Sequence, residues 1–303
     1  MPLITPEMWD AIVVGGGPAG LSAALMLGRC RRRVLLCDDG HPRNDAVREA
    51  HGFFSRDGTD PHELLRLGRE QLIPYGVALR QVRVEDAIAA AHGFDVALAD
   101  GAREPCRKLV LATGVRDRRP EVEGFAELFG RGIWVCPYCD GWEVRDRPLA
   151  VYARGSAGAE FAIGLLSWSR DLCLFTDGDR RLDRRWRATL AERGVAWRPE
   201  KLARFYGDDQ GFRGVELAGG ERIAREALFF HLGVEQRSPL PAKLGCQLDR
   251  RGLVKVSREG QRTGVPNLWV IGDASQDALL VVVAAAEGTT AALSIHKELR
   301  DQG

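Results

Sequence analysis

Hydrophobic and polar positions along the 303-residue chain follow patterns that predict an α/β protein. Residues 10–28 and 148–166 share one pattern, in which a short apolar run leads through small residues into apolar positions spaced as on a helix. A strand, a tight turn and a helix in this order open a βαβ unit. The pattern therefore predicts two units of similar architecture in one chain.

A late strand indicates that the first unit is interrupted. Residues 267–275 form another predicted strand, which ends in Gly272 and Asp273 and is followed by a helical pattern over 278–299. A single nucleotide-binding domain needs no such strand, whereas a domain that resumes at the C-terminus does. We therefore expect two Rossmann-like, three-layer domains: a discontinuous one at 1–117 and 244–303, and one inserted between them at 118–243.

Composition and charge narrow the function classes. The chain is 45% hydrophobic and 28% charged, with a formal net charge of +1, which gives no reason to expect a nucleic-acid or membrane partner. Residues 1–10 lack the basic and apolar segments of a secretory signal. The longest apolar run, 278–286, has nine residues and is too short to span a bilayer. We expect a cytoplasmic protein.

The first copy of the pattern carries a dinucleotide-binding motif. Gly15, Gly17 and Gly20 form G-x-G-x-x-G between an apolar run and a helix, where they allow a tight turn, close approach of a pyrophosphate and helix–strand packing. Asp38 ends the next strand, where an acid grips a ribose hydroxyl. The predicted dinucleotide-binding residues here are Gly15, Gly17, Pro18, Ala19, Gly20 and Asp38.

Two further strand ends favour FAD over NAD at this site. The apolar run 108–111 ends in Ala112, Thr113 and Gly114, and the late strand ends in Gly272 and Asp273. Either alone reads as an ordinary strand end, but their order along the chain is specific. Asp273 is placed to reach the sugar-alcohol chain of the cofactor.

Cys136 and Cys139 form a Cys-x-x-Cys pair, which is compatible with half a zinc site, a structural disulfide or a redox centre. Structural zinc takes four ligands, usually from two such pairs, and no second pair exists in the sequence. A static disulfide closing so short a loop constrains the unfolded chain little. We therefore predict a redox centre with no metal. The other five cysteines are expected to be small core residues.

This order of features resembles the low-molecular-weight thioredoxin reductase family of flavoproteins. The glycine-rich turn at 15–20, the 112–114 strand end, the 136–141 segment, the second Rossmann turn and the 272–273 strand end carry the resemblance. It implies FAD in the discontinuous domain, the dithiol in the inserted domain, a homodimer, and electron flow from NADPH through FAD to a protein disulfide.

The resemblance also assigns roles around the redox pair. It makes Cys139 the sulfur next to the flavin and Cys136 the sulfur that exchanges with substrate. The two-residue spacing lets each sulfur resolve a mixed disulfide on the other. Asp140 is placed to take and return the proton that accompanies reduction.

The segment 39–58 is assigned to the cofactor by the same resemblance. Arg43 and Asn44 are expected near the FAD phosphates or ribityl chain, and His51 and Gly52 near the isoalloxazine. A surface charge is the alternative for Arg43, and a core-edge histidine with a satisfied hydrogen bond is the alternative for His51.

The second Rossmann turn departs from the family. Ala153 replaces its first glycine, which is tolerable only if φ stays negative there. After the next strand the family has a histidine and paired arginines for the 2′-phosphate of NADPH, whereas this chain has carboxylates at Asp177 and Asp179. Asp177 instead suits a ribose hydroxyl, as in NADH. The C-terminal helix also lacks the family's Arg-Gln.

We therefore expect a thioredoxin reductase-like enzyme whose use of NADPH is doubtful. NADH or a ferredoxin-like protein are the other donors, and a thioredoxin-like protein or a small disulfide or dithiol is the expected substrate. One alternative is an FAD-dependent dithiol oxidase that uses oxygen, resembling those of sulfur-containing natural-product pathways. Another is a flavin-binding redox sensor with little turnover.

Overall fold

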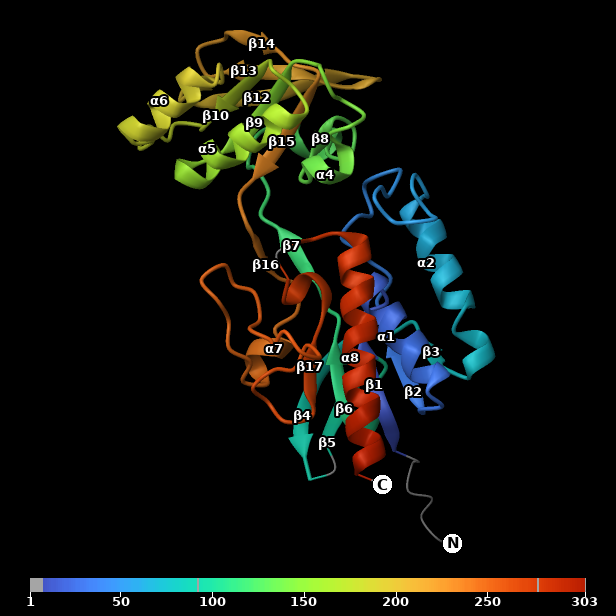
Figure 1. Cartoon of the computed structure of the whole chain (residues 1–303). Coiled ribbons are helices and arrows are strands. Elements are labelled where there is room, and N and C mark those ends of the chain that lie inside the picture. Colours follow the sequence, from blue (N-terminus) through green and yellow to red (C-terminus); the bar gives the residue numbers. More distant parts are fainter. Residues whose placement is uncertain (1–7, 92, 277, 303) are drawn as a thin grey trace, which may run out of the picture. The chain divides into compact units, whose positions relative to one another are not determined.

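The computed structural model describes residues 8–91, 93–276 and 278–302, and the chain divides into two compact units (Figure 1). The first unit takes in the chain up to Asp45, Gly52–Arg116 and the chain from Val234 onward. The second unit consists of Ala46–His51 and Asp117–Gly233. Each unit has its own sheet and its own buried core.

Seven strands form the sheet of the first unit: β1 (Trp9–Val14), β2 (Val34–Cys37), β3 (Ala78–Arg80), β4 (Val84–Ala90), β5 (Gly93–Leu98), β6 (Arg103–Leu111) and β17 (Leu268–Val270). Their order is β3-β2-β1-β6-β5-β4, with β17 also on β6. The pairs β1–β2, β1–β6, β2–β3 and β6–β17 are parallel, and β4, β5 and β6 are antiparallel. The late strand therefore joins the first sheet, as expected.

The helices of the first unit are α1 (Pro18–Arg29), α2 (Pro61–Glu70), α7 (Leu240–Lys243) and α8 (Val281–Asp301), with 3₁₀ turns at Ile73–Tyr75 and Gly272–Ala274. Helices α1 and α8 lie side by side (Figure 1). Their contact is close because Gly288 has no side chain: a Cβ there would lie 2.1 Å from the Ala19 oxygen. Small residues thus bring the late helix against the helix of the glycine-rich turn.

The second unit has a five-stranded parallel sheet in the order β11-β10-β9-β15-β8. These strands are β8 (Ile133–Trp134), β9 (Leu149–Ala153), β10 (Leu172–Phe175), β11 (Ala196–Arg198) and β15 (Ala227–His231). The antiparallel strands β12 (Leu202–Asp208), β13 (Gly211–Leu217) and β14 (Arg222–Ala224) form a second sheet. The helices are α3 (Phe125–Leu128), α4 (Pro137–Asp140), α5 (Gly155–Gly164) and α6 (Arg184–Glu192), with a 3₁₀ turn at Leu165–Ser167. This architecture matches the predicted α/β class.

The two chain crossings form strands rather than loops. Strands β7 (Val115–Asp117) and β16 (Val234–Gln236) pair with each other. The inserted domain was predicted to end at residue 243, whereas residues 234–243 lie in the first unit. The reason is packing, because Leu240 is 1% exposed and belongs to the core of that unit. Within the described residues, every helix is too short or too polar to cross a membrane.

Candidate active site

The three glycines of the first turn have different surroundings. Gly15 has φ +107°, and a Cβ there would lie 2.3 Å from the Ala112 oxygen. At Gly20 a Cβ would lie 1.8 Å from the Gly15 oxygen, so that only glycine allows α1 to pack on the strand. At Gly17, by contrast, a Cβ would meet no atom within 4 Å. The middle glycine therefore borders open space, as close approach of a ligand requires.

Helix α1 presents its N-terminus to that space. It begins with Pro18 and Ala19, has no side-chain cap at Gly17 and has no acidic residue in its first turn. Its first N–H groups and the positive end of its dipole are therefore suited to an anionic group. The turn fits the pyrophosphate of a dinucleotide.

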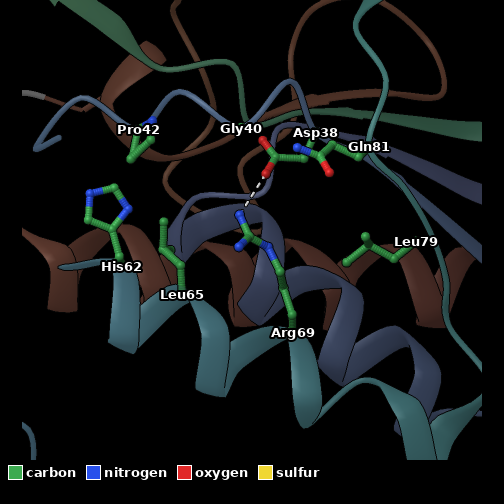
Figure 2. A pocket seen from close by; sticks show the side chains of 8 residues that line it. All are labelled: Asp38, Gly40, Pro42, His62, Leu65, Arg69, Leu79 and Gln81. Atoms are coloured by element: carbon green, nitrogen blue, oxygen red, sulfur yellow. Dashed lines mark hydrogen bonds and ion pairs between the residues drawn. The ribbon is translucent and has the colours of Figure 1, made fainter. Parts of the chain in front are cut away.

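Asp38 lies at the edge of a pocket of about 180 Å³ (Figure 2). Its Oδ1 accepts a hydrogen bond of 3.0 Å from the Gly16 N–H, which fixes it against the glycine-rich turn. Its Oδ2 forms a 3.0 Å ion pair with Arg69 of α2, and Leu65 of the same helix also lines the pocket. The pocket offers a carboxylate, a guanidinium, an apolar wall and the amide of Gln81, which fits a nucleoside. The sequence pattern did not single out Arg69.

Arg43 and Asp273 contact each other across the first unit. Their ion pair measures 3.3 Å, and their side chains are 22% and 20% exposed. Arg43 is therefore not the isolated surface charge that was the alternative. Asn44 is half-buried in the adjoining turn. The structure thus brings together two of the predicted cofactor residues.

A buried carboxylate supports the 272–273 strand end. Glu287 of α8 is 6% exposed and accepts 2.7 Å hydrogen bonds from the Gly272 N–H and from Gln276 Nε2. Burial raises the pKa of Glu287, although these hydrogen bonds oppose the shift. Sequence reasoning missed this residue, although a lone acid in an apolar helical run is a signal that was available.

The 112–114 strand end contains an unsatisfied polar atom. The Ala112 N–H donates a 2.8 Å bond to the Val14 oxygen, which fixes the loop on β1. Gly114 adopts φ +65°. Thr113 Oγ1 is buried and has no hydrogen-bond partner among the described residues. A buried hydroxyl without a partner costs free energy, so this atom fits a polar group of a bound cofactor.

The two cysteines of the predicted redox pair form a disulfide with a Cα–Cα distance of 5.3 Å. Cys136 caps the short helix α4, and its Sγ accepts a 3.1 Å hydrogen bond from the Cys139 N–H. Gly141 permits a tight turn after the pair, because a Cβ there would lie 2.4 Å from the Pro137 oxygen. Tyr138 is 76% exposed, so the turn lies at the surface of the second unit.

Asp140, directly after the cysteine pair, has a strongly raised pKa. Burial and the negative charge of Glu143 raise the pKa of Asp140 to about 7, against the opposing effect of His51. A carboxyl with this pKa holds and releases a proton near neutral pH, as a general acid must. The predicted role of Asp140 thus has an electrostatic basis, to which Glu143 contributes.

His51 lies in the second unit, whereas Gly52 lies in the first. Its Nε2 is 3.4 Å from Glu49 Oε2 and 3.7 Å from Glu143 Oε1. Gly52 adopts φ +73°, and its N–H donates a 2.7 Å bond to Asp57. The two neighbours therefore belong to different units, and His51 lies beside Glu143, which follows the cysteine pair.

The second Rossmann turn keeps its helix despite the alanine. Ala153 is absent from the residues with positive φ, and Gly158 packs against it, as the sequence condition requires. Asp177, only 7% exposed, accepts from Tyr152 Oη and Lys201 Nζ at 2.9 Å, from Arg154 Nη2 at 3.2 Å and from the Leu202 N–H at 3.0 Å. Burial alone would raise the pKa of Asp177, but these hydrogen bonds outweigh it and lower the pKa. Protein donors thus already engage both oxygens expected to take a ribose hydroxyl.

The remaining thiols are largely buried, as expected. Cys37, Cys106, Cys173 and Cys246 are buried, and Cys30 is half-buried. Burial raises the pKa of both Cys37 and Cys106 to about 12, which leaves almost no thiolate at neutral pH. These residues belong to the packing of the two units.

The chain is similar to known proteins over nearly its whole length. The family model for pyridine nucleotide-disulphide oxidoreductases matches residues 9–288. A probable thioredoxin reductase of Arthroderma benhamiae is 32% identical over 99% of this chain and 83% of its own. The crystal structure of HlmI is 36% identical, with a TM-score of 0.93 over 99% of this chain and 95% of that one. A putative thioredoxin reductase, TrxB of Bacillus anthracis, is 29% identical, with a TM-score of 0.91 over 97% and 99%.

Proposed function

Since the chain belongs to the pyridine nucleotide-disulphide oxidoreductase family and is an FAD-dependent, thioredoxin reductase-like enzyme, we propose that it moves two electrons between FAD and a disulfide or dithiol substrate through Cys136 and Cys139. The observation that carries this proposal is the Cys136–Cys139 disulfide followed by a carboxyl whose pKa is about 7. FAD supplies or accepts the two electrons when bound.

The proposed FAD site is in the first unit. The α1 N-terminus and Gly17 face the pyrophosphate, and Asp38 with its pocket takes the adenosine end. Thr113 offers its unpartnered hydroxyl. The remaining residues of this unit assigned to the cofactor are Gly15, Pro18, Ala19, Gly20, Arg43, Asn44, Gly52, Ala112, Gly114, Gly272 and Asp273. His51, which the sequence also assigns to the cofactor, belongs to the second unit.

In the reducing direction, the Cys136 thiolate attacks one sulfur of the substrate disulfide, and the other sulfur leaves with the electron pair of the broken bond. Cys139 then attacks Cys136, which releases the second substrate sulfur and forms the Cys136–Cys139 bond. The bond from the Cys139 N–H supports charge on the Cys136 sulfur. Asp140 provides a proton for the departing thiolate. In the oxidising direction the same bonds form and break in reverse.

The electron donor is proposed to differ from that of NADPH-using relatives. A 2′-phosphate at the end of β10 would meet Asp177, and Arg154 and Lys201 are already paired with that carboxylate. Arg181 pairs with Asp179 at 2.9 Å. This arrangement disfavours NADPH and leaves a ferredoxin-like protein, or NADH held without Asp177, as donors. It is also compatible with the alternative function, in which a small dithiol is oxidised and oxygen is the final acceptor.

A thioredoxin-like protein is the proposed substrate of the reductase, in keeping with the relative named a probable thioredoxin reductase. A small disulfide or dithiol is the substrate in the alternative function. A homodimer and a cytoplasmic location stay predictions.

Anaerobic mixing of the FAD-loaded protein with NADPH, and separately with NADH, tests the donor. Rapid flavin bleaching by NADH alone would support the proposal, and equally rapid bleaching by NADPH would contradict it. If neither bleaches the flavin but a dithiol does, the oxidase direction is supported, and oxygen consumption with the dithiol then measures turnover. Cys136→Ser should abolish turnover in either direction, whereas a protein that only binds its partner would be unaffected.

A further inference from the structure

Side chains from two distant parts of the chain meet at the turn that carries Asp140. Asp140 and Glu143 follow the cysteine pair directly. Glu49 and His51 belong to a six-residue segment, Ala46–His51, that is part of the second unit although both flanking segments belong to the first. Packing thus brings an imidazole to the acidic turn of the redox pair.

The segment is held in place by close backbone contact. Gly130 adopts φ +78°, and a Cβ there would lie 2.1 Å from the Ala46 oxygen. Ala50 is 6% exposed and anchors the other end of the segment. His51 is consequently a fixed member of the second unit, with a side chain that is only 20% exposed.

Two side chains of this cluster act on Asp140 in opposite directions. His51 Nε2 is 3.7 Å from Glu143 Oε1 and 3.4 Å from Glu49 Oε2, and the carboxylate side chains are 39% and 60% exposed. Glu143 raises the proton affinity of Asp140, whereas His51 lowers it. Arg145, in the segment that follows, stacks 4.0 Å from the centre of the Trp142 ring and donates to the Trp142 oxygen.

We infer that His51 and Glu143 are positioning residues for the proton of Asp140, and that their opposing electrostatic effects set the pH at which Asp140 protonates the Cys139 thiolate. The inference rests on the proposed function, because it needs thiol–disulfide exchange at this pair. When a substrate dithiol reduces the pair, its thiolate attacks Cys136 Sγ, and the electron pair of the broken S–S bond goes to Cys139 Sγ. Asp140 gives that sulfur a proton. The second substrate thiol then releases Cys136 and leaves the substrate as a disulfide.

The arrangement predicts opposite effects for two conservative variants. His51→Gln removes the imidazole that lowers the pKa of Asp140, so that Asp140 should keep its proton to higher pH. Glu143→Gln removes a negative charge, so that Asp140 should lose its proton at lower pH. Each shift should be about one pH unit, the low end of the effect of a neighbouring charge. A general loss of packing would not move the two variants in opposite directions.

The experiment is reduction of the Cys136–Cys139 disulfide by dithiothreitol in anaerobic, FAD-loaded protein, followed by rapid alkylation and mass spectrometry across a range of pH. The rates are divided by the thiolate fraction of dithiothreitol at each pH, so that the remaining pH dependence reports the ionisation of the protein. The wild type should show one inflection near pH 7, the value of the Asp140 pKa. Glu192→Gln, which neutralises an exposed acid on α6 of the same unit, is the matched control and should leave the inflection in place.

The outcomes distinguish failure of the inference about His51 and Glu143 from failure of the proposed acid role of Asp140. Inflections that move up in His51→Gln and down in Glu143→Gln, and that vanish in Asp140→Asn, support the inference. An inflection that vanishes in Asp140→Asn but stays fixed in both other variants overturns the inference and leaves the proposed function intact. An inflection that persists in Asp140→Asn overturns both the inference and the proposed acid role of Asp140.

Discussion

Arg43 and Asp273 form an ion pair of 3.3 Å although 230 residues separate them in the chain. One lies in the loop after β2 and the other in the turn after β17, at the ends of strands on opposite sides of β1 and β6 in the sheet order. The pair therefore joins the early and late parts of the discontinuous first unit at the edge where the cofactor is proposed to bind.

Arg43→Ala should weaken FAD binding about tenfold, or about 1.4 kcal/mol, because Asp273 loses its partner and the proposed phosphate contact disappears. Titration of apoprotein with FAD, followed by flavin fluorescence, measures the change. Arg56→Ala removes an exposed arginine near the same loop and should bind FAD normally. Equal affinities for the Arg43 variant and the wild type would remove Arg43 from the site.

Alanine at Gly20 and at Gly17 should produce two different defects. At Gly20 the new Cβ would lie 1.8 Å from a backbone oxygen, so Gly20→Ala should destabilise the apoprotein by about 3 kcal/mol or prevent folding. Gly17→Ala meets no protein atom within 4 Å and should fold normally but lose FAD. Thermal unfolding of the apoproteins and their flavin content separate the two effects. A Gly17→Ala protein with full flavin content would contradict this assignment.

Asp177→Asn should lose stability in a pH-dependent way. The pKa of Asp177 is lowered in the folded protein, so its ionised form stabilises the fold above the unfolded pKa of about 3.9, and this contribution is lost as pH falls through the folded pKa. In urea unfolding, the variant should therefore be less stable than the wild type at neutral pH. The gap should narrow as the solution becomes acidic, and a gap independent of pH would argue against an ionised Asp177.

Asp140→Asn should change the free energy of unfolding in the opposite direction to Asp177→Asn. The pKa of Asp140 is raised to about 7, so the folded protein holds this proton more tightly than the unfolded chain, and wild-type stability falls as pH rises from about 4 towards 7. The asparagine variant avoids that cost and should be the more stable protein above neutral pH, while its thiol–disulfide exchange slows. Urea unfolding of both oxidised proteins on either side of pH 7 checks this expectation.

Local patterns predicted the parts of the structure that depend on neighbours in sequence. The glycine-rich turn follows from steric limits within a few residues, and the late strand shows as an apolar run, so both were predictable. The partners of the predicted residues were not, because they arrive through tertiary packing. Arg69 reaches Asp38 from α2, and Lys201, the residue before β12, reaches Asp177. No short-range pattern encodes either contact.

The sequence also did not predict that residues 46–51 belong to the second unit. The family resemblance predicts His51 near the flavin ring, and it gives no sign that the contact of Ala46 with Gly130 makes the His51 segment part of the second unit. The sequence predicts that Asp177 binds a ribose hydroxyl, because a carboxylate at the end of this strand suits that role. Its burial among Tyr152, Arg154 and Lys201 depends on how β9, β10 and β12 come together.

Because the other thiols are largely buried, thiol labelling of the native protein should report mainly on Cys136 and Cys139. Four cysteines lie in the cores of the two units, and Cys30 is half-buried, so a thiol reagent applied to the native protein meets little competition away from the redox turn. After mild reduction, a maleimide dye or an isotope-coded tag would attach mainly at Cys136 and Cys139. The redox state of the pair can therefore be followed by labelling alone, without mutating any background cysteine.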